Sequence, residues 1–395
     1  MKKEAVKNLD QGVLRKMTNL VMEKHSDLRK TVRRFVQNEI VPYVEEWEES
    51  GFPDEIFKKM GEMGLFGVCY PEEYGGSNMD YFAAMAVTEE IVASGSGGLG
   101  MAFNVQSLMA TNPILKYGTD YHLENYLIPA IKGEKIAGLG ITEPSAGSDV
   151  AGLKTIANKV DGGWLINGSK VFITNGQRAD FLILIAKTDP DAGMNGFSIF
   201  LVDSDLDGYT VGQKLKKVGM RASDTTEIFF ENVFVSDNAL LGFEGNGFKQ
   251  LMWQLDGERL IQATACVAGA QRCLDLATQY VQEREQFGKP ISKKQVIRHY
   301  LADMQTEVGA ARALLYQTAA SYDKGIVLPK EISMTKLFAS QVYFRTADQA
   351  LQIHGGYGYM DEYPISREWR DSRLMRIGGG TDEIQKEIIA KHMNL

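Results

Sequence analysis

The stretch Trp164-Leu165-Ile166-Asn167-Gly168-Ser169-Lys170-Val171-Phe172-Ile173 decides the middle of the fold. An Asn-Gly pair stands between two apolar runs, and both residues of a tight hairpin turn need a positive φ that Asn and Gly tolerate. The stretch therefore predicts a β-hairpin. Further apolar runs bounded by Gly and Asp predict strands at residues 181–186, 197–202 and 228–235. Together they favour a small antiparallel β-barrel or sandwich over residues 138–243.

Both flanks of this strand zone show helical periodicity. Leu28, Val32 and Phe35 recur at i, i+4 and i+7 on the N-terminal side. A C-terminal apolar seam suits a helix bundle or a subunit interface, and equally ordinary core packing. Its residues are Ile297, Leu301, Met304, Val308, Ala311 and Leu315. Helices, then strands, then helices argue against a doubly wound parallel sheet.

The sequence therefore predicts an α+β protein of three domains. We expect an N-terminal helical domain at residues 1–137, a middle β domain at 138–243 and a C-terminal helical bundle at 244–395.

Composition excludes several function classes. The net charge is −8, from 43 Lys and Arg against 51 Asp and Glu, which argues against a nucleic-acid partner. Cys69, Cys266 and Cys273 show no metal-binding spacing and the five histidines are scattered, so no metal site is expected. No apolar run reaches the roughly 20 residues of a membrane span. Residues 1–4 lead into no secretory signal, so we expect a cytoplasmic protein, or a matrix protein whose transit peptide has been removed.

Gly95-Ser96-Gly97-Gly98-Leu99-Gly100 matches the G-x-G-x-x-G pattern of dinucleotide-binding loops. That fingerprint requires a preceding strand within a βαβ unit. Here the pattern follows a helical segment at residues 84–93. The glycines are therefore predicted to mark a helix end or close helix packing.

The stretch Leu139-Gly140-Ile141-Thr142-Glu143-Pro144-Ser145-Ala146-Gly147-Ser148-Asp149 concentrates small residues and hydroxyls at the edge of the strand zone. Such a loop lets main-chain N–H groups approach a flat, polar or anionic ligand closely. Taken alone, it is also typical of a plain β-turn.

Four further segments give this loop more weight because of their order along the chain. They are Val171-Phe172-Ile173-Thr174-Asn175-Gly176, Arg284-Glu285-Gln286-Phe287-Gly288-Lys289-Pro290, Gln352-Ile353-His354-Gly355-Gly356-Tyr357-Gly358 and Gly380-Thr381. With the loop, they resemble the acyl-CoA dehydrogenase family from about residue 25 to the end. The resemblance implies a helical domain, a β domain and a C-terminal four-helix bundle, with FAD bound between them. It also implies a homotetramer built as a dimer of dimers.

The resemblance further implies which residues hold the flavin ring within one subunit. Thr142 would hydrogen-bond its polar edge, Phe172 and Thr174 would lie on its other side, and Ser148 would also touch CoA. Many members have tryptophan where this chain has Phe172, so the ring contact here would be smaller. Without the resemblance, Phe172 would be assigned to the core. The implied set is Leu139, Ile141, Thr142, Gly147, Ser148, Phe172, Ile173 and Thr174.

A second set is implied to reach the pyrophosphate and adenine of a neighbouring subunit's FAD, which makes the cofactor site composite. Glycines permit backbone contact there and Arg284 supplies charge. This set is Arg284, Gln286, Phe287, Gln295, Gln352, Gly355 and Gly356. Thr381 is expected to cap the last helix, with Glu383 favourable in its first turn, and in the family this helix start also touches the cofactor.

Family members remove the α-proton of an acyl-CoA thioester and pass the β-hydrogen as hydride to flavin N5, which gives a trans-2-enoyl-CoA. That chemistry needs a carboxylate near the α-carbon and hydrogen-bond donors at the thioester oxygen. Many members place the glutamate directly before the Gly-Thr of the last motif, where this chain has Gly379. Isovaleryl-CoA and long-chain acyl-CoA dehydrogenases place it in a bundle helix within Asp-x-Glu-Arg, and this chain has Asp256-Gly257-Glu258-Arg259 there.

We therefore predict that Glu258 is the catalytic base and that its apolar cleft raises its pKa. Gly379 is expected to offer its backbone N–H to the thioester oxygen, with Gly380 beside the substrate. Asp256 and Arg259 are implied to contact the pantetheine of CoA. The alternative from the residues alone is a set of ordinary charged side chains at a helix start.

Three functions stay open at this level. The first is an acyl-CoA dehydrogenase that hands its electrons to an electron-transfer flavoprotein. The second is an oxidase on the same fold, or a dehydrogenase of a thioester bound to a carrier protein. The third is a binding scaffold without catalysis, which Glu258 and the flavin segments disfavour. The identity of the acyl group is not encoded in any of these motifs.

Overall fold

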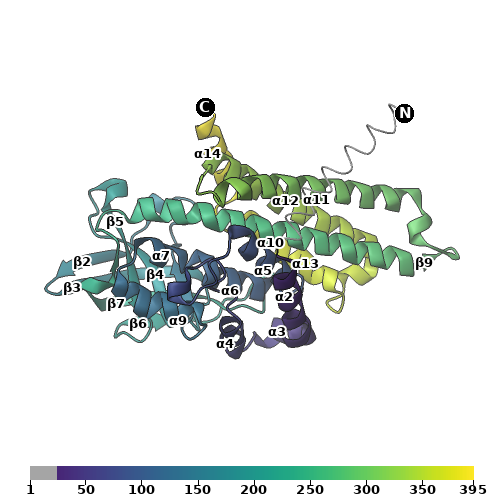
Figure 1. The fold of residues 1–395 in the computed structure, drawn as a ribbon. Helices are drawn as coiled ribbons and strands as arrows, with labels where there is room; N and C mark the ends of the chain where they lie inside the picture. Colours follow the sequence, from purple (N-terminus) through teal and green to yellow (C-terminus); the bar gives the residue numbers. More distant parts are fainter. Residues whose placement is uncertain (1–24) are drawn as a thin grey trace.

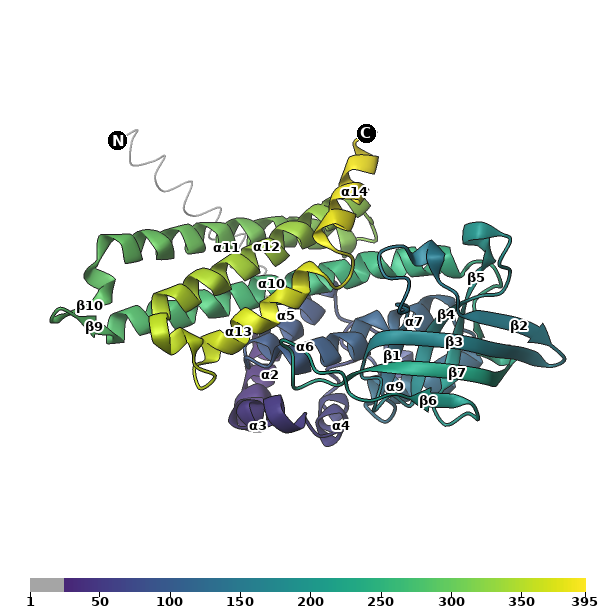
Figure 2. The ribbon, with the colours of Figure 1, turned by 180° about the vertical axis from the view of Figure 1, so that it is seen from behind.

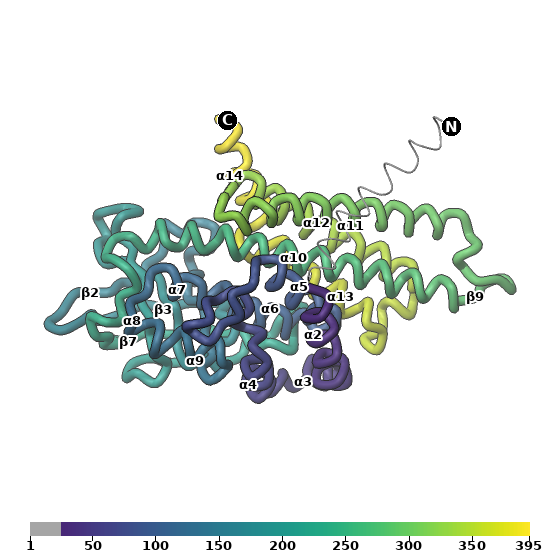
Figure 3. The backbone as a smooth tube through the Cα atoms, viewed as in Figure 1, coloured from purple at the N-terminus to yellow at the C-terminus, as the bar shows by residue number. Residues whose placement is uncertain are grey.

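The computed structural model describes residues 25–395, so the predicted lack of a secretory signal at residues 1–4 lies outside the described residues. The chain passes from helices into a sheet and back into long helices, as the tube in Figure 3 shows. In this part of the chain no helix is both long and apolar enough to cross a bilayer.

Short helices make up the N-terminal part. They are α2 (Ser26–Glu39), α3 (Val44–Ser50), α4 (Glu55–Glu62), α5 (Tyr81–Val92), α6 (Gly97–Asn104), α7 (Asn112–Tyr117), α8 (Asp120–His122) and α9 (Ile128–Ile131). Val32 and Phe35 of α2 are buried, as their spacing predicts. The G-x-G-x-x-G segment follows α5 rather than a strand, and Ser96 caps α6 by accepting a hydrogen bond from the Leu99 N–H. These glycines therefore serve helix ends and packing, as predicted.

The middle of the chain forms one sheet of eight strands. The strands are β1 (Ala137–Gly140), β2 (Ile156–Val160), β3 (Gly163–Thr174), β4 (Phe181–Lys187), β5 (Phe197–Asp203), β6 (Tyr209–Val211), β7 (Thr225–Ser236) and β8 (Leu240–Leu241). Their order is β6-β7-β3-β2-β4-β5-β8, with β1 beside β4. Most pairs are antiparallel, as predicted, but β1 and β2 run parallel to β4.

The hairpin predicted at Asn167-Gly168 is wrong, because both residues lie inside the single strand β3. The register with β7 shifts beside Gly168. The Asn167 side chain bonds across this irregularity to Asn232 of β7, whose φ is 52°. An Asn-Gly pair can thus mark a β-bulge instead of a turn. The true hairpin turn lies one element earlier, at residues 161–162 between β2 and β3.

Five helices form the C-terminal part, with a small hairpin between the first two. They are α10 (Gly247–Glu283), α11 (Gln295–Tyr322), α12 (Pro329–His354), α13 (Pro364–Ser372) and α14 (Asp382–His392), and the hairpin pairs β9 (Glu285–Gln286) with β10 (Lys289–Pro290). In the predicted seam of α11, Met304, Val308, Ala311 and Leu315 are buried. Thr381 caps α14 by accepting a hydrogen bond from the Ile384 N–H, as predicted.

Helix α10 connects the parts of the molecule. Figures 1 and 2 show it running from the sheet at one end to the β9 hairpin at the other, with α11 and α12 alongside. Its buried residues share one hydrophobic core with the N-terminal helices and α12. Near its start, Leu251 and Leu255 pack with Ile141 and Ala146 from the loop after β1. The loop therefore lies against α10 one turn before Glu258.

Candidate active site

Glu258 has an amide side chain one helical turn away on each side. Gln254 Nε2 donates to Glu258 Oε2 at 3.3 Å, and Gln262 Nε2 donates to Oε1 at 3.1 Å. Residues at i−4 and i+4 share a helix face, so the geometry of α10 brings the three side chains together. Both glutamines are 3% exposed, while Glu258 is half-buried.

Burial raises the pKa of the Glu258 carboxyl, as predicted. The hydrogen bond from Gln254 and the positive charges of Arg259 and Lys336 oppose this rise without cancelling it. A carboxylate with a raised pKa accepts a proton more readily than an ordinary one. Such a group is suited to general-base catalysis near neutral pH.

The glycine loop before α14 is held beside this carboxylate by side chains from three helices. Gly379 O accepts hydrogen bonds from Arg259 Nε at 3.2 Å and from Gln385 Nε2 at 3.1 Å. Gly380 O accepts one from Lys336 Nζ at 2.7 Å. The φ angles of Gly379 and Gly380 are 65° and 95°, which glycine adopts without strain. The orientation of the peptide groups in this loop is thereby fixed.

Asp256 and Arg259 are largely occupied with each other. Arg259 Nη1 donates to Asp256 Oδ1 at 3.1 Å. Arg259 is 6% exposed and Asp256 is 8% exposed. Arg259 also holds Gly379 O. Their contact with pantetheine stays a prediction.

Phe172 leaves the sheet at a second β-bulge. Between the pairs formed by Lys170 and Ile173 with β7, strand β3 carries one extra residue, and Phe172 has a φ of 61°. A bulge redirects a side chain, and the Phe172 ring is 66% exposed although Val171 and Ile173 on either side of it are buried. An exposed ring beside a loop of small residues fits one face of a flavin.

The loop of small residues after β1 is held by a buried ion pair between Lys170 and Glu143. Lys170 Nζ donates to Glu143 Oε1 at 2.8 Å and to Ile141 O at 3.0 Å. Glu143 also accepts the N–H groups of Lys154 and Thr155. Burial alone would raise the pKa of Glu143, but Lys170 and these N–H groups lower it on balance. The pair fixes the backbone from which Thr142, Gly147 and Ser148 project.

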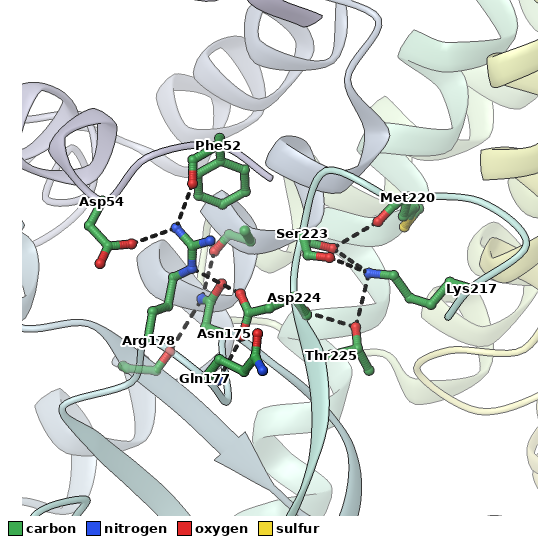
Figure 4. Close-up of polar contacts among 12 residues, drawn as sticks. Phe52, Asp54, Asn175, Gln177, Arg178, Lys217, Met220, Ser223, Asp224 and Thr225 are labelled. Carbon is green, nitrogen blue, oxygen red and sulfur yellow. Dashed lines mark hydrogen bonds and ion pairs between the residues drawn. The ribbon is translucent and has the colours of Figure 1, made fainter. Parts of the chain in front are cut away.

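The end of β3 is anchored to the N-terminal helices, as Figure 4 shows. Arg178 Nε donates to Asp224 Oδ1 at 2.9 Å, and its Nη1 reaches Asp54 Oδ1 at 2.7 Å. Lys217 Nζ donates to the carbonyl of Ser223 at 2.8 Å and to its hydroxyl at 2.7 Å. The Arg178 bonds join the segment after β3 to Asp54 at the start of α4 and to Asp224 before β7, while Lys217 braces the segment before β7.

A hollow of about 810 Å³ lies at the other end of the bundle. It is lined by several residues of the second predicted set, namely Arg284, Gln286, Gln352, Gly355 and Gly356. Phe287 is 90% exposed on the nearby hairpin, with a φ of 53°. Gln295 is exposed at the start of α11 and does not line the hollow. An arginine next to glycine backbone fits a pyrophosphate.

The structure thus places the predicted site residues in two separate groups. From Glu258 to the end of α10 at Glu283 the helix rises roughly 38 Å, at about 1.5 Å per residue. Figure 1 shows β3 and β9 at opposite ends of the molecule. The two groups of predicted cofactor residues therefore lie at opposite ends of the same chain.

Sequence reasoning missed the residues that support the site. Gln254 and Gln262 were detectable, because spacings of four around Glu258 place them on its helix face. Lys336 of α12 and Lys170 of β3 carried no such signal, because only the tertiary fold brings them to the glycine loop and to Glu143. In the described part of the chain, no group of three or more His, Cys, Asp or Glu residues is arranged to bind a metal ion.

Comparison with known proteins identifies the same three-part organisation. Three family models match, described as the N-terminal, middle and C-terminal domains of acyl-CoA dehydrogenase, over residues 22–134, 138–233 and 245–394. A rice isovaleryl-CoA dehydrogenase, named as mitochondrial, is 40% identical over 374 residues, which cover 94% of this chain and 91% of the relative. A rat long-chain specific acyl-CoA dehydrogenase, also named as mitochondrial, is 37% identical over 392 residues, covering 98% and 90%.

A solved structure agrees with these relatives. The crystal structure of an acyl-CoA dehydrogenase from Geobacillus kaustophilus superimposes with a TM-score of 0.92 at 38% identity, covering 94% of this chain and 98% of that one. The predicted fold class is confirmed by this match and by the three family models.

Proposed function

Because this chain belongs to the acyl-CoA dehydrogenase family, whose members are FAD-dependent oxidoreductases, we propose that Glu258 is the base that removes the α-proton of a bound acyl-CoA. The observation that carries this proposal is that the Glu258 carboxyl group is held by hydrogen bonds and has a raised pKa. Two amides fix its oxygens and burial raises its pKa, while position 379 holds a glycine that offers no carboxylate.

The surrounding residues would prepare the thioester for this proton transfer. The carbonyl oxygens of Gly379 and Gly380 are bound by protein side chains, which hold the loop in place. The Gly379 N–H in this loop would donate to the thioester oxygen. That donor would stabilise the negative charge that develops on the oxygen as the proton leaves. The proton would pass to the nearer oxygen of Glu258.

FAD, when bound, accepts the β-hydrogen as hydride. Phe172 would pack against one face of its ring, and the loop bearing Thr142 and Ser148 would provide polar contacts. The Lys170–Glu143 pair would keep this loop in place. The product of the proposed reaction is a trans-2-enoyl-CoA, and we propose an electron-transfer flavoprotein as the acceptor and the cytoplasm or an organellar matrix as the compartment.

The purified yellow protein should bleach when it is mixed with an acyl-CoA thioester in the absence of oxygen. A panel of straight and branched acyl chains, ranked by kcat/KM, would identify the substrate. Bleaching that persists in air until an electron-transfer flavoprotein is added supports the proposal. Rapid recolouring in air alone would indicate an oxidase, and a response only to carrier-protein thioesters would change the substrate class. No bleaching with any thioester would refute the proposed function.

We further propose that each FAD is shared between two chains in a homotetramer built as a dimer of dimers. The flavin ring would bind near Phe172 of one chain, and the pyrophosphate and adenine would bind in the hollow near Arg284 of its neighbour. This proposal is supported by the separation of the two groups along α10 and by the exposure of Phe172 and Phe287.

An Arg284→Ala variant should weaken FAD binding about ten- to hundredfold, because a charge-assisted hydrogen bond contributes roughly 1.5–3 kcal/mol. Flavin-to-protein ratios measured over a dilution series would reveal the loss. Lys330→Ala, which removes a partly exposed cation near the start of α12, serves as the matched control and should keep its flavin. Equal flavin retention by the two variants would contradict the shared site.

A further inference from the structure

We propose that Gln262 is a positioning residue that orients the Glu258 carboxylate and keeps it ionised for catalysis. This inference rests on the proposed function of Glu258. Its basis is a hydrogen bond of 3.1 Å from Gln262 Nε2 to Glu258 Oε1, made by a side chain that is 3% exposed. Because Gln254 binds the other oxygen, the carboxylate is held at both ends.

Gln262 also occupies the space next to the glycine loop. A Cβ atom at position 379 would lie 2.7 Å from Gln262 Oε1 and 2.9 Å from its Nε2, so the end of the Gln262 side chain would have to shift to admit it. The φ of 65° at Gly379 adds a second barrier to any side chain there. The amide of Gln262 therefore contacts the base on one side and lies next to the backbone of position 379 on the other.

The effect of this contact on proton affinity follows from its chemistry. An amide N–H that donates to a carboxylate stabilises the charged form and lowers the pKa of the acid. The charged groups acting on Glu258 are Arg259 on its own helix and Lys336 on α12, and both also favour the ionised state. Asp256 faces Arg259 rather than Glu258. Burial opposes these charges. Because the Gln262 N–H donates to Glu258 Oε1, we expect the pKa of Glu258 to rise further when this donor is removed.

The test compares Gln262→Leu with the wild-type holoenzyme. Leucine keeps the approximate volume but has no donor. We expect the acid limb of the kcat–pH profile to move about one pH unit to higher pH, since one charged hydrogen bond is worth about that much. At any pH below the acid limbs of both proteins, the kcat of Gln262→Leu should then be about tenfold lower than that of the wild type, with little change in KM. Purely structural damage would lower activity at all pH values without moving the limb.

The same helix offers a matched control. Gln279 Nε2 donates to Glu283 Oε1 at 2.9 Å, an exposed glutamine–glutamate pair with the same spacing of four residues, remote from Glu258. Gln279→Leu should leave the limb where the wild type has it. If Gln262→Leu fails to fold, Gln262→Met removes the same donor with an unbranched side chain and carries the same expectation.

A second measurement does not depend on turnover. The infrared band of protonated Glu258 can be assigned by its absence in Glu258→Gln, and its titration should move to higher pH in Gln262→Leu. Coincident titrations and coincident acid limbs in Gln262→Leu and wild type would overturn the role of Gln262 and leave the proposed function standing. A wild type that turns over no thioester would refute the proposed function instead, while the infrared titration would still decide whether Gln262 controls the carboxyl group.

Discussion

A Glu258→Gln variant should lose kcat by roughly 10²–10⁴-fold while it keeps its fold and its flavin, since general-base catalysis contributes about that factor. Glutamine matches glutamate in shape, so packing around α10 is preserved. Its neutral amide cannot take the α-proton. In the described part of the chain, position 379, the other place where the family puts its base, offers only a glycine.

The measurement is single-turnover flavin bleaching with a good thioester, together with binding of the enoyl-CoA product. Product should still bind, because Gly379 and the loop near Phe172 are unchanged. The matched control is Glu283→Gln, which alters an exposed glutamate on the same helix and should bleach at the wild-type rate. Normal turnover by Glu258→Gln would remove this residue from the mechanism.

A Lys170→Met variant should be destabilised by about 3–5 kcal/mol, the usual result of removing one partner of a buried ion pair. Lys170 is fully buried and Glu143 is 5% exposed, so the carboxylate left behind could not be hydrated without opening the sheet. Because Lys170 also binds Ile141 O, the loop that we propose for the flavin should loosen as well. Both denaturant unfolding and flavin content should report the change.

The control for this variant lies in the same sheet. Lys159 of β2 pairs with Asp237 at the surface, where both side chains are more than half exposed, and such pairs contribute at most about 1 kcal/mol. Lys159→Met should therefore be close to wild type. Adding Glu143→Gln to Lys170→Met should recover part of the loss, because it removes the unpaired buried charge. Recovery should be incomplete, because the Lys154 and Thr155 N–H groups bind different carboxylate oxygens and a glutamine offers only one. A Lys170→Met protein as stable as wild type would show that the pair is dispensable.

The sequence predicted the order of helices and strands because periodicity is a local property. The strands at residues 181–186, 197–202 and 228–235 and the seam of α11 were recovered on that basis. The Asn-Gly hairpin failed because the same residues that form a tight turn can also face a bulge, and only pairing with β7 distinguishes the two outcomes. The bulge at Phe172 was not predicted either. It explains the exposure of a ring that apolar character alone would assign to the core and that the family resemblance assigns to flavin contact.

For the site, the sequence predicted Glu258 and its raised pKa, because the family motif and desolvation both point to them. The two amides that hold the carboxylate lie four residues before and after it, so the sequence contained a signal for them that was not used. The glycine loop beside them carried no such signal, because only the tertiary fold brings Gly379 to Arg259, 120 residues away. Nor did the sequence predict that Arg259 would be occupied with Asp256 and the glycine loop rather than being free for a ligand.

The distance between the hollow at Arg284 and the carboxyl group of Glu258 has a genetic consequence under the shared-site proposal. A chain damaged in the hollow would keep its own Glu258 and deprive its neighbour of flavin. A chain damaged at Glu258 would be unable to remove the α-proton itself, but its intact hollow would still bind the flavin of its neighbour. Two inactive alleles of these opposite kinds could therefore complement each other within mixed assemblies, whereas two alleles of the same kind could not.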